Sequence, residues 1–168
     1  GDIVVCYLGD AAMNQGQVFE AMNMAATWEL PVLFVIENNR YGMGTDIHRT
    51  TSIDHLWKRA RAFDMAYSDV DGMNVLSVAA HVGPVVDAVR GSNKPHLLEA
   101  NTYRYKGHSV SDPGTYRTKE EVAQYQAIDP LLQLAAMLTK EKISSAQELE
   151  ALDDEIREQL AGIEKIAD

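Results

Sequence analysis

The chain has 168 residues, of which 46% are hydrophobic and 24% are charged, a balance typical of globular proteins. A chain of this length buries roughly 70% of its unfolded surface, which is enough for a substantial core. The formal net charge of −10 argues against general nucleic-acid binding. No stretch approaches the ~20 apolar residues that span a bilayer. The single cysteine, Cys6, excludes an internal disulfide framework and a cysteine-cluster zinc site, so we expect a soluble protein in a reducing setting.

The first fifty residues read as a β-α-β unit. Residues 3–8 and 32–36 are short continuous apolar runs, typical of parallel strands that are buried on both faces. Between them, apolar residues recur at helical spacing: Val18, Phe19, Met22, Ala25 and Ala26. Pro31 ends this helix, because the residue before a proline avoids helical dihedrals. We expect the two strands to be parallel with a right-handed crossover.

Helices and strands continue to alternate further along the chain. We expect a helix over 54–63 capped by Asp54, strands over 66–70 and 96–100, and a helix from the cap Asn74 to Gly91. Pro84 should kink or interrupt that second helix. Residues 101–118 form a polar loop, and a loop longer than ~12–15 residues is usually functional or disordered.

The C-terminal part is predicted to be helical. Asp129 precedes Pro130, the pattern of an N-cap with proline in the first turn, and predicts a helix to about residue 141. Ser145 and Glu148 have the spacing of a capping box, which opens a last helix to about residue 166.

These elements predict an α/β fold with a mostly parallel sheet and helices on both faces. We expect an α/β domain over 1–128 and a helical C-terminal extension over 129–168. The chain begins at Gly1, directly before the strand-like run over 3–8, and its first residues do not have the pattern of a signal peptide. We therefore expect a fragment whose N-terminal part is missing.

Polar side chains follow the first two predicted strands at the points where they end. Gly9 and Asp10 close the first strand, and Asn38 and Asn39 close the second. In an open parallel sheet, ligands bind beyond the carboxyl ends of the strands, where neighbouring strand ends lie close together. Mg²⁺ is usually held by one or two carboxylates, neutral oxygens and substrate phosphates. Asp10 and Asn39 therefore predict a magnesium site, whereas Asn38 is expected to be structural.

The turn after the first strand suits an anion. Gly9 permits a tight bend, and the small side chains of Ala11 and Ala12 let a ligand approach their backbone N–H groups. The N-terminus of the following helix adds partial positive charge and unpaired donors. The sequence thus predicts a diphosphate that Mg²⁺ bridges between the two strand ends.

The segment from Gly9-Asp10 to Asn38-Asn39 resembles the thiamin diphosphate motif, which begins Gly-Asp-Gly and ends Asn-Asn. Its text, GDAAMNQGQVFEAMNMAATWELPVLFVIENNRYGMGT, is similar to alpha subunits of the 2-oxo acid dehydrogenase family, in particular the pyruvate dehydrogenase first component. The later text YRYKGHSVSDPGTYRTKEE is similar to the active-site loop of those subunits, and DPLLQLAAML to their C-terminal tail. The resemblance covers essentially the whole chain.

The resemblance implies roles for the strand-end residues. Asp10 and Asn39 match the magnesium ligands, and Tyr41 matches the position whose backbone carbonyl binds the same ion. Gly9, Ala11 and Ala12 match the turn that contacts the diphosphate. Ala11 departs from the usual glycine, and it is tolerated if its φ is negative, since positive φ would cost an alanine ~1 kcal/mol or more.

The resemblance also implies roles in the loop. His108 matches a histidine that reaches the diphosphate and the active centre, where it would stabilise or protonate charged species. Ser109 matches a serine that a dedicated kinase phosphorylates in mitochondrial enzymes. The segment 112–117 is one residue shorter than the mammalian form and lacks its second serine. That departure favours a bacterial relative and argues against control by such a kinase.

The activity implied is decarboxylation of a 2-oxo acid, pyruvate, with acyl transfer to a lipoyl group. The cofactors implied are thiamin diphosphate and Mg²⁺. The partners implied are a beta subunit, in a heterotetramer, and the lipoyl acyltransferase core of the complex. The beta subunit would bind the pyrimidine half of the cofactor, so the chain alone should be inactive. We expect the bacterial cytoplasm, with the mitochondrial matrix and the plastid as alternatives.

Other functions stay open at this stage. Within the family, the alternative is an acetoin or branched-chain 2-oxo acid dehydrogenase. A magnesium-dependent phosphatase could use Asp10 as nucleophile, although such enzymes commonly need a second acid where this chain has Ala12. The chain could also be a non-catalytic module that holds a cofactor or partner. The remaining histidines have no ligand spacing and no predicted role: His48, His55, His81 and His96.

Overall fold

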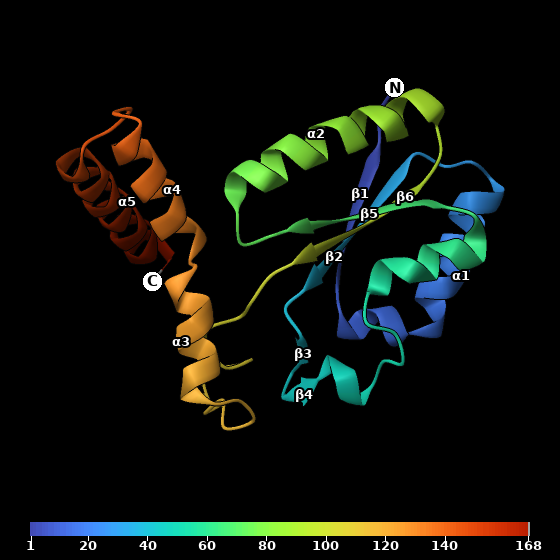
Figure 1. Ribbon diagram of the computed structural model, residues 1–168, viewed down its shortest axis with the longest axis horizontal. Helices are drawn as coiled ribbons and strands as arrows, with labels where there is room; N and C mark the ends of the chain where they lie inside the picture. The colour runs from blue at the N-terminus through green and yellow to red at the C-terminus, as the bar shows by residue number, and fades with distance from the viewer. Residues whose placement is uncertain (168) are drawn as a thin grey trace. The chain divides into compact units, whose positions relative to one another are not determined.

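Figure 1 shows a computed structural model that describes residues 1–167, with side chains described as far as residue 163. The chain divides into two compact units, of which the first comprises Gly1–Ala127 and the second begins at Ile128. Each unit is described by itself below.

A four-stranded sheet forms the centre of the first unit. The strand order is β1-β2-β6-β5, and every neighbouring pair is parallel. The strands are β1 (Val4–Gly9), β2 (Val32–Asn38), β5 (Ala66–Asp71) and β6 (His96–Asn101). The predicted parallel sheet and the parallel pairing of the first two strands are confirmed.

Helices cover both faces of this sheet, as predicted (Figure 1). On one face, α1 (Gly16–Thr27) and a 3-10 helix, η3 (Leu56–Phe63), pack against Phe34 and Ile36 of β2. On the other face, α2 (Val75–Ser92) packs against Leu33 and Val35 of the same strand. Successive side chains of a strand point to opposite faces, so the continuous apolar run of β2 supplies both cores.

The prediction that the first strand is buried on both faces is wrong. β1 lies at the edge of the sheet and pairs only with β2. Cys6 and Leu8 pack against the α1 core, but on the other face Val5 and Tyr7 are 41% and 66% exposed. A continuous apolar run shows that a strand can be buried on both faces, but it does not show which neighbours cover it.

The helix predicted over 54–63 with Asp54 as its cap is also wrong in part. The segment forms η3, and its N-cap is His55, whose side chain makes no capping hydrogen bond. Instead, the backbone N–H of Trp57 donates to Oε2 of Glu99 at 3.0 Å. Glu99 is fully buried in β6. The free N–H at this helix start is therefore satisfied by a tertiary contact that local sequence does not reveal.

The helix predicted after Asn74 is confirmed, but its interruption is not. Asn74 Oδ1 accepts from the N–H groups of Leu76 and Ser77 at 3.1 and 3.0 Å. α2 runs unbroken through Pro84. Pro84 lies on the exposed face, where solvent can hydrate the carbonyl that loses its N–H partner, and Val85 and Val89 beyond it are buried.

The long polar loop is confirmed, since residues 102–118 contain no helix or strand. Several short elements around it had no sequence prediction: η1 (Ala11–Asn14), β3 (Tyr41–Gly42), β4 (Thr45–Asp46), η2 (Ile47–Arg49) and α3 (Lys119–Ala127). β3 and β4 form a small antiparallel hairpin directly after β2.

The second unit consists of α4 (Pro130–Lys140) and α5 (Ala146–Ala167). Both predicted caps are present. Asp129 Oδ1 accepts from the N–H of Leu131 at 2.8 Å. Ser145 and Glu148 form the reciprocal capping box, with N–H to side-chain oxygen distances of 2.7 and 3.3 Å. No helix among the described residues is long and apolar enough to cross a membrane.

His96, for which the sequence predicted no role, is a buried histidine at the start of β6. It is 8% exposed, and its Nε2 lies 2.8 Å from Oγ of Ser68 on β5. Burial lowers the pKa of His96 to about 4, and the charge of His81 acts in the same direction. Between about pH 4 and pH 6.5, this imidazole is therefore neutral in the folded chain and protonated in the unfolded chain.

This burial predicts a pH-dependent stability. Between pH 6.5 and 4 the unfolded state takes up a proton at His96 that the folded state refuses, so the free energy of unfolding should fall as the pH is lowered. The contribution is at most about 3 kcal/mol. Urea unfolding at several pH values should show a shallower pH dependence for His96→Asn than for the parent chain. Identical slopes for His96→Asn and the parent chain would contradict the prediction.

Candidate functional site

The parallel pairing of β1 with β2 brings the predicted site residues together. Gly9 pairs with Glu37 at the carboxyl ends of the strands, so the chain after each strand leaves the sheet at the same edge. Asp10 is 2% exposed. The backbone N–H groups of Asn39 and Ala11 face its carboxylate. Asp10 and Asn39 are therefore neighbours, as the sequence predicted.

The Asp10 carboxylate is incompletely satisfied. Its Oδ2 is buried and has no hydrogen-bond partner among the described residues. Burial is the largest influence and raises the pKa of Asp10, while nearby backbone N–H groups and the positive charge of Arg104 oppose it. A buried acceptor without a partner is costly, and a buried anion is more so. A cation bound at Oδ2 would remove that cost.

The two asparagines after β2 have different surroundings. Asn38 is buried, donates through Nδ2 to Oε1 of Glu99 at 2.6 Å, and accepts the N–H of Arg40 at 3.1 Å. These bonds fit the structural role that was predicted for it. Asn39 Oδ1 accepts only the N–H of Tyr41 among the bonds described, at 3.2 Å. Because a carbonyl oxygen has two lone pairs, Asn39 keeps one for a ligand.

The turn after β1 differs from the expected geometry. Gly9 has no positive φ, and a Cβ there would meet nothing within 4 Å, so no tight bend requires this glycine. η1 rather than the long helix follows Asp10 directly, and α1 begins only at Gly16. Ala11 has a negative φ, so the condition for tolerating alanine there is met. Ala12 lies in the same 3-10 turn.

Glycine is required at position 42 instead. A Cβ built on Gly42 would lie 2.5 Å from the Cβ of Ala11. The β3 hairpin therefore packs directly on the turn after β1, and this close approach fixes the Tyr41 segment beside Asp10. The methyl group of Ala11 fits only because residue 42 has no side chain.

The loop returns to this edge of the sheet through Arg104. Its Nη2 donates to the carbonyl of Met43 at 2.6 Å and to the hydroxyl of Tyr116 at 2.9 Å. Its Nη1 donates to the Tyr41 carbonyl at 3.5 Å and lies 3.4 Å from Nδ1 of His108. Arg104 thus joins the loop histidine to the carbonyl that the resemblance assigned to the metal.

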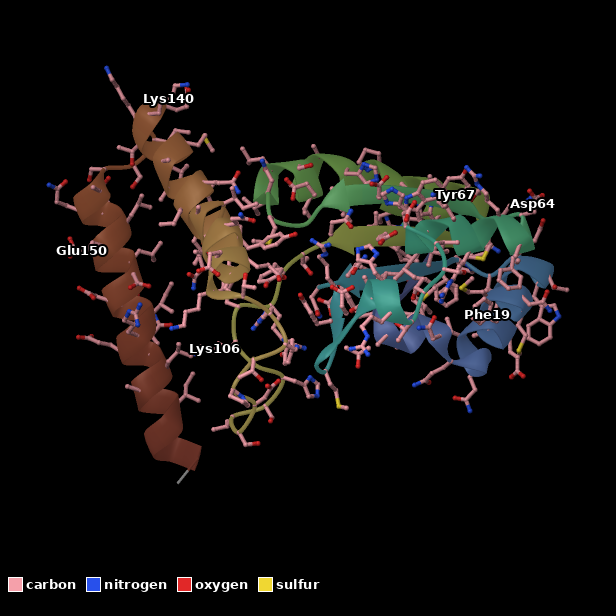
Figure 2. All side chains as sticks on the ribbon, turned by 60° about the horizontal axis from the view of Figure 1, so that its bottom comes forward. Phe19, Asp64, Tyr67, Lys106, Lys140 and Glu150 are labelled. Carbon is pink, nitrogen blue, oxygen red and sulfur yellow. The ribbon has the colours of Figure 1, made fainter. Side chains whose placement is uncertain are left out.

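Asp112 organises the tip of the loop. Its carboxylate accepts from the N–H groups of His108 and Gly114 at 2.7 and 2.8 Å and from the Tyr116 hydroxyl at 3.0 Å. These donors hold the pKa of Asp112 below its usual range. Ser109 is exposed on the same loop, with its Oγ 3.2 Å from Oγ of Ser111. Lys106 marks this loop in Figure 2.

The donor set indicates which metal could bind. No group of three or more His, Cys, Asp or Glu side chains in the described part of the chain could hold a metal ion. The strand-end site instead offers one carboxylate, one amide oxygen and a backbone carbonyl. Such a set suits a hard cation that completes its shell with water and ligand phosphates, as Mg²⁺ does.

The whole chain, residues 1–168, matches the family described as dehydrogenase E1 component. The chain belongs to this family. Curated relatives include proteins named pyruvate dehydrogenase E1 component subunit alpha. The one from Rickettsia typhi is 41% identical over 94% of this chain and 48% of its own length. The one from Zymomonas mobilis is 47% identical over 95% of this chain and 45% of its own length.

The resemblance inferred from the sequence is thus confirmed. The chain spans about half the length of the curated relatives it matches. The sequence predicted neither α3 nor the contacts of Arg104. An alternation of tyrosines, Tyr103 and Tyr105, was the available signal that the loop carries a packed aromatic face.

The contact between Ala11 and Gly42 predicts that a substitution at one position can compensate for a substitution at the other. Gly42→Ala should lower the free energy of unfolding by about 1–3 kcal/mol, because the added methyl group overlaps Ala11. The double variant Ala11→Gly, Gly42→Ala removes that overlap and should recover most of the loss in urea unfolding. Gly9→Ala is the control and should change stability little. A double variant as unstable as Gly42→Ala would show that this contact is not the cause.

Proposed function

We propose that this chain is the part of a pyruvate dehydrogenase alpha subunit that binds the Mg²⁺-diphosphate end of thiamin diphosphate. The observation that carries the proposal is the buried Oδ2 of Asp10, which lies at the ends of two adjacent parallel strands and has no hydrogen-bond partner within the residues that the structure describes. Membership of the dehydrogenase E1 component family and relatives named as pyruvate dehydrogenase alpha subunits support it.

The metal would be held by Asp10 Oδ2, Asn39 Oδ1 and the carbonyl of Tyr41. Each of these carbonyl oxygens has two lone pairs, and among the described hydrogen bonds Asn39 Oδ1 accepts one N–H and the Tyr41 carbonyl accepts the long 3.5 Å bond from Arg104. A divalent cation would compensate the buried carboxylate, and its remaining positions would be left for water and diphosphate oxygens.

The diphosphate would lie against the turn after β1. The backbone of Gly9, Ala11 and Ala12 would contact it, because small side chains leave their N–H groups accessible. Arg104 would add positive charge at the same edge, since its charge already acts on Asp10. The cation and these donors together would offset the negative charge of a diphosphate.

The catalytic group proposed on this chain is His108. Arg104 can only donate, so Nδ1 of His108 accepts and its ring proton is placed on Nε2. An exposed imidazole in this tautomer can donate a hydrogen bond or a proton to a charged group beside the diphosphate. When bound, thiamin diphosphate supplies the nucleophilic carbon that adds to the keto group of a 2-oxo acid and allows CO₂ to leave.

The proposal includes partners and location. A beta subunit would complete the site in a heterotetramer, and a lipoyl acyltransferase core would accept the acyl group. In this proposal, residues 1–128 form the domain that binds the cofactor, and residues 129–168 form a helical extension. A bacterial cytoplasmic setting fits relatives from Rickettsia and Zymomonas.

Ser109 is proposed as a regulatory position. It is exposed and directly follows His108. A phosphate there would add about two negative charges beside the proposed diphosphate site and would repel that ligand. The proposal does not require that a kinase acts on this protein.

Metal-dependent cofactor binding tests the proposal. In the complete protein with its beta subunit, calorimetry should show thiamin diphosphate binding that requires Mg²⁺. Asp10→Asn should weaken it by at least about tenfold, because the only carboxylate of the site is lost. Asp87→Asn is the matched control, since that side chain is 81% exposed on α2. Absence of cofactor binding, together with Asp10-dependent hydrolysis of a phosphate ester, would favour the phosphatase alternative instead.

The substrate is tested by turnover. The reconstituted complex should decarboxylate pyruvate and acylate a lipoyl domain, and the chain without its beta subunit should do neither. Acetoin and branched-chain 2-oxo acids should be poorer substrates. A preference for either of these would reassign the substrate within the family, and cofactor binding without turnover would indicate a non-catalytic module.

A further inference from the structure

Helix α3 is attached to the segment that follows the candidate metal ligand Asn39. Tyr125 and Glu121 lie four residues apart on α3, so they share one face of the helix. The Tyr125 hydroxyl accepts from Nη1 of Arg40 at 2.7 Å. Oε1 of Glu121 accepts from the Tyr41 hydroxyl at 2.8 Å. The two residues directly after Asn39 are therefore both held by the same helix face.

Glu121 makes a second bond that strengthens this attachment. The same Oε1 accepts from the hydroxyl of Tyr103 at 2.9 Å. Tyr103 in turn stacks on Tyr125, with ring centroids 3.9 Å apart and planes inclined by 4°. Tyr41 and Tyr103 are 5% and 7% exposed, so these hydroxyl groups have little access to water.

The electrostatics of this cluster agree with the geometry. Burial is the largest influence on both phenols, and together with Glu121 it raises the pKa of Tyr41 and of Tyr103. Both tyrosines therefore remain donors at neutral pH. The guanidinium of Arg117 lies over the Tyr41 and Tyr103 rings, with its central carbon 5.9 and 5.3 Å from their centroids. The carboxylate of Glu121 accepts hydrogen bonds from the hydroxyl groups of both buried tyrosines.

We propose that Glu121 is a positioning residue that holds the Tyr41 backbone carbonyl at the metal site. The inference rests on the proposed function, in which that carbonyl is a metal ligand. In this proposal Glu121 is not itself a ligand of the metal or of the diphosphate. It acts through the Tyr41 side chain, and Tyr125 on the same helix face holds Arg40.

The position of Tyr41 also governs its other contacts. Its carbonyl accepts from Arg104, and its N–H donates to Oδ1 of Asn39. A shift of Tyr41 would therefore change two of the three proposed metal ligands and the loop arginine together. Residues that orient metal ligands in this way typically contribute a factor of about 10–100 to metal affinity.

The experiment measures metal affinity in the complete protein with its beta subunit, using Mn²⁺ as a paramagnetic probe for the Mg²⁺ site. Glu121→Ala should weaken Mn²⁺ binding about tenfold. Glu121→Gln should stay near the parent value, because the amide oxygen can still accept both hydroxyl groups. Glu120→Ala is the matched control, since Glu120 is exposed on the adjacent position of α3.

Tyr41→Phe removes the same contact from the other side. It should weaken Mn²⁺ binding as much as Glu121→Ala, and the double variant should be no weaker than either single one, because all three lack one shared bond. This comparison still tests the inference if Glu121→Ala folds poorly. Unchanged Mn²⁺ affinity in both single variants, or fully additive losses, would overturn it.

A second readout separates this inference from the proposed function. Without metal or cofactor, hydrogen exchange of the backbone over 40–46 should be faster in Glu121→Ala than in the parent and in Glu120→Ala. If the parent protein binds no metal but shows this difference, the proposed function fails and the attachment of Tyr41 to α3 stands. If the parent binds Mn²⁺ and exchange is unchanged in Glu121→Ala, the inference fails and the function stands.

Discussion

The parallel pairing of β1 with β2 is the constraint on which the site depends. It places the ends of two strands side by side, so that Asp10 becomes buried within reach of the Asn39 backbone. Burial then determines the chemistry of this carboxylate. Its Oδ2 has no hydrogen-bond partner in the described part of the chain, and a bound cation would stabilise a buried carboxylate oxygen of this kind. In the proposed site, a hard metal with a phosphate ligand would meet this requirement together with the neutral oxygens of Asn39 and Tyr41.

Glu99 and Glu121 show how the fold uses carboxylates to join segments that are distant in the sequence. Fully buried Glu99 accepts from Nδ2 of Asn38 and from the N–H of Trp57, so it joins the end of β2 to the start of η3. Glu121 joins α3 to Tyr41 and Tyr103. Each carboxylate fixes the chain on one side of Asn39, through Asn38 before it and through Tyr41 after it. The candidate ligand thus lies between two anchored neighbours.

Much of this could be predicted from local sequence patterns. The parallel strands, the Asn74 and Asp129 caps and the capping box at Ser145 all depend on residues close together in the chain. The pairing of Asp10 with Asn39 could also be predicted, because parallel strands joined by one helix end at the same edge. The failures concern distant contacts. Nothing near Asp54 shows that Glu99 caps η3, and an apolar run does not show that β1 lies at an edge.

The difference between local patterns and distant contacts also explains why the sequence predicted a steric need for glycine at position 9 and not at position 42. Sequence reasoning assigned a tight bend to Gly9, yet β1 leaves the sheet there without positive φ. The steric requirement lies at Gly42, which packs against Ala11 although more than one helix or strand separates the two residues in the sequence. Alanine is therefore tolerated at position 11, where the family usually has glycine, for two reasons. The backbone of Ala11 has negative φ, and Gly42, which packs against it, has no side chain. The close approach of Gly42 to Ala11 holds the Tyr41 segment beside the turn that contains Asp10, so in the proposed site the packing at position 42 would affect the metal ligands at the strand ends.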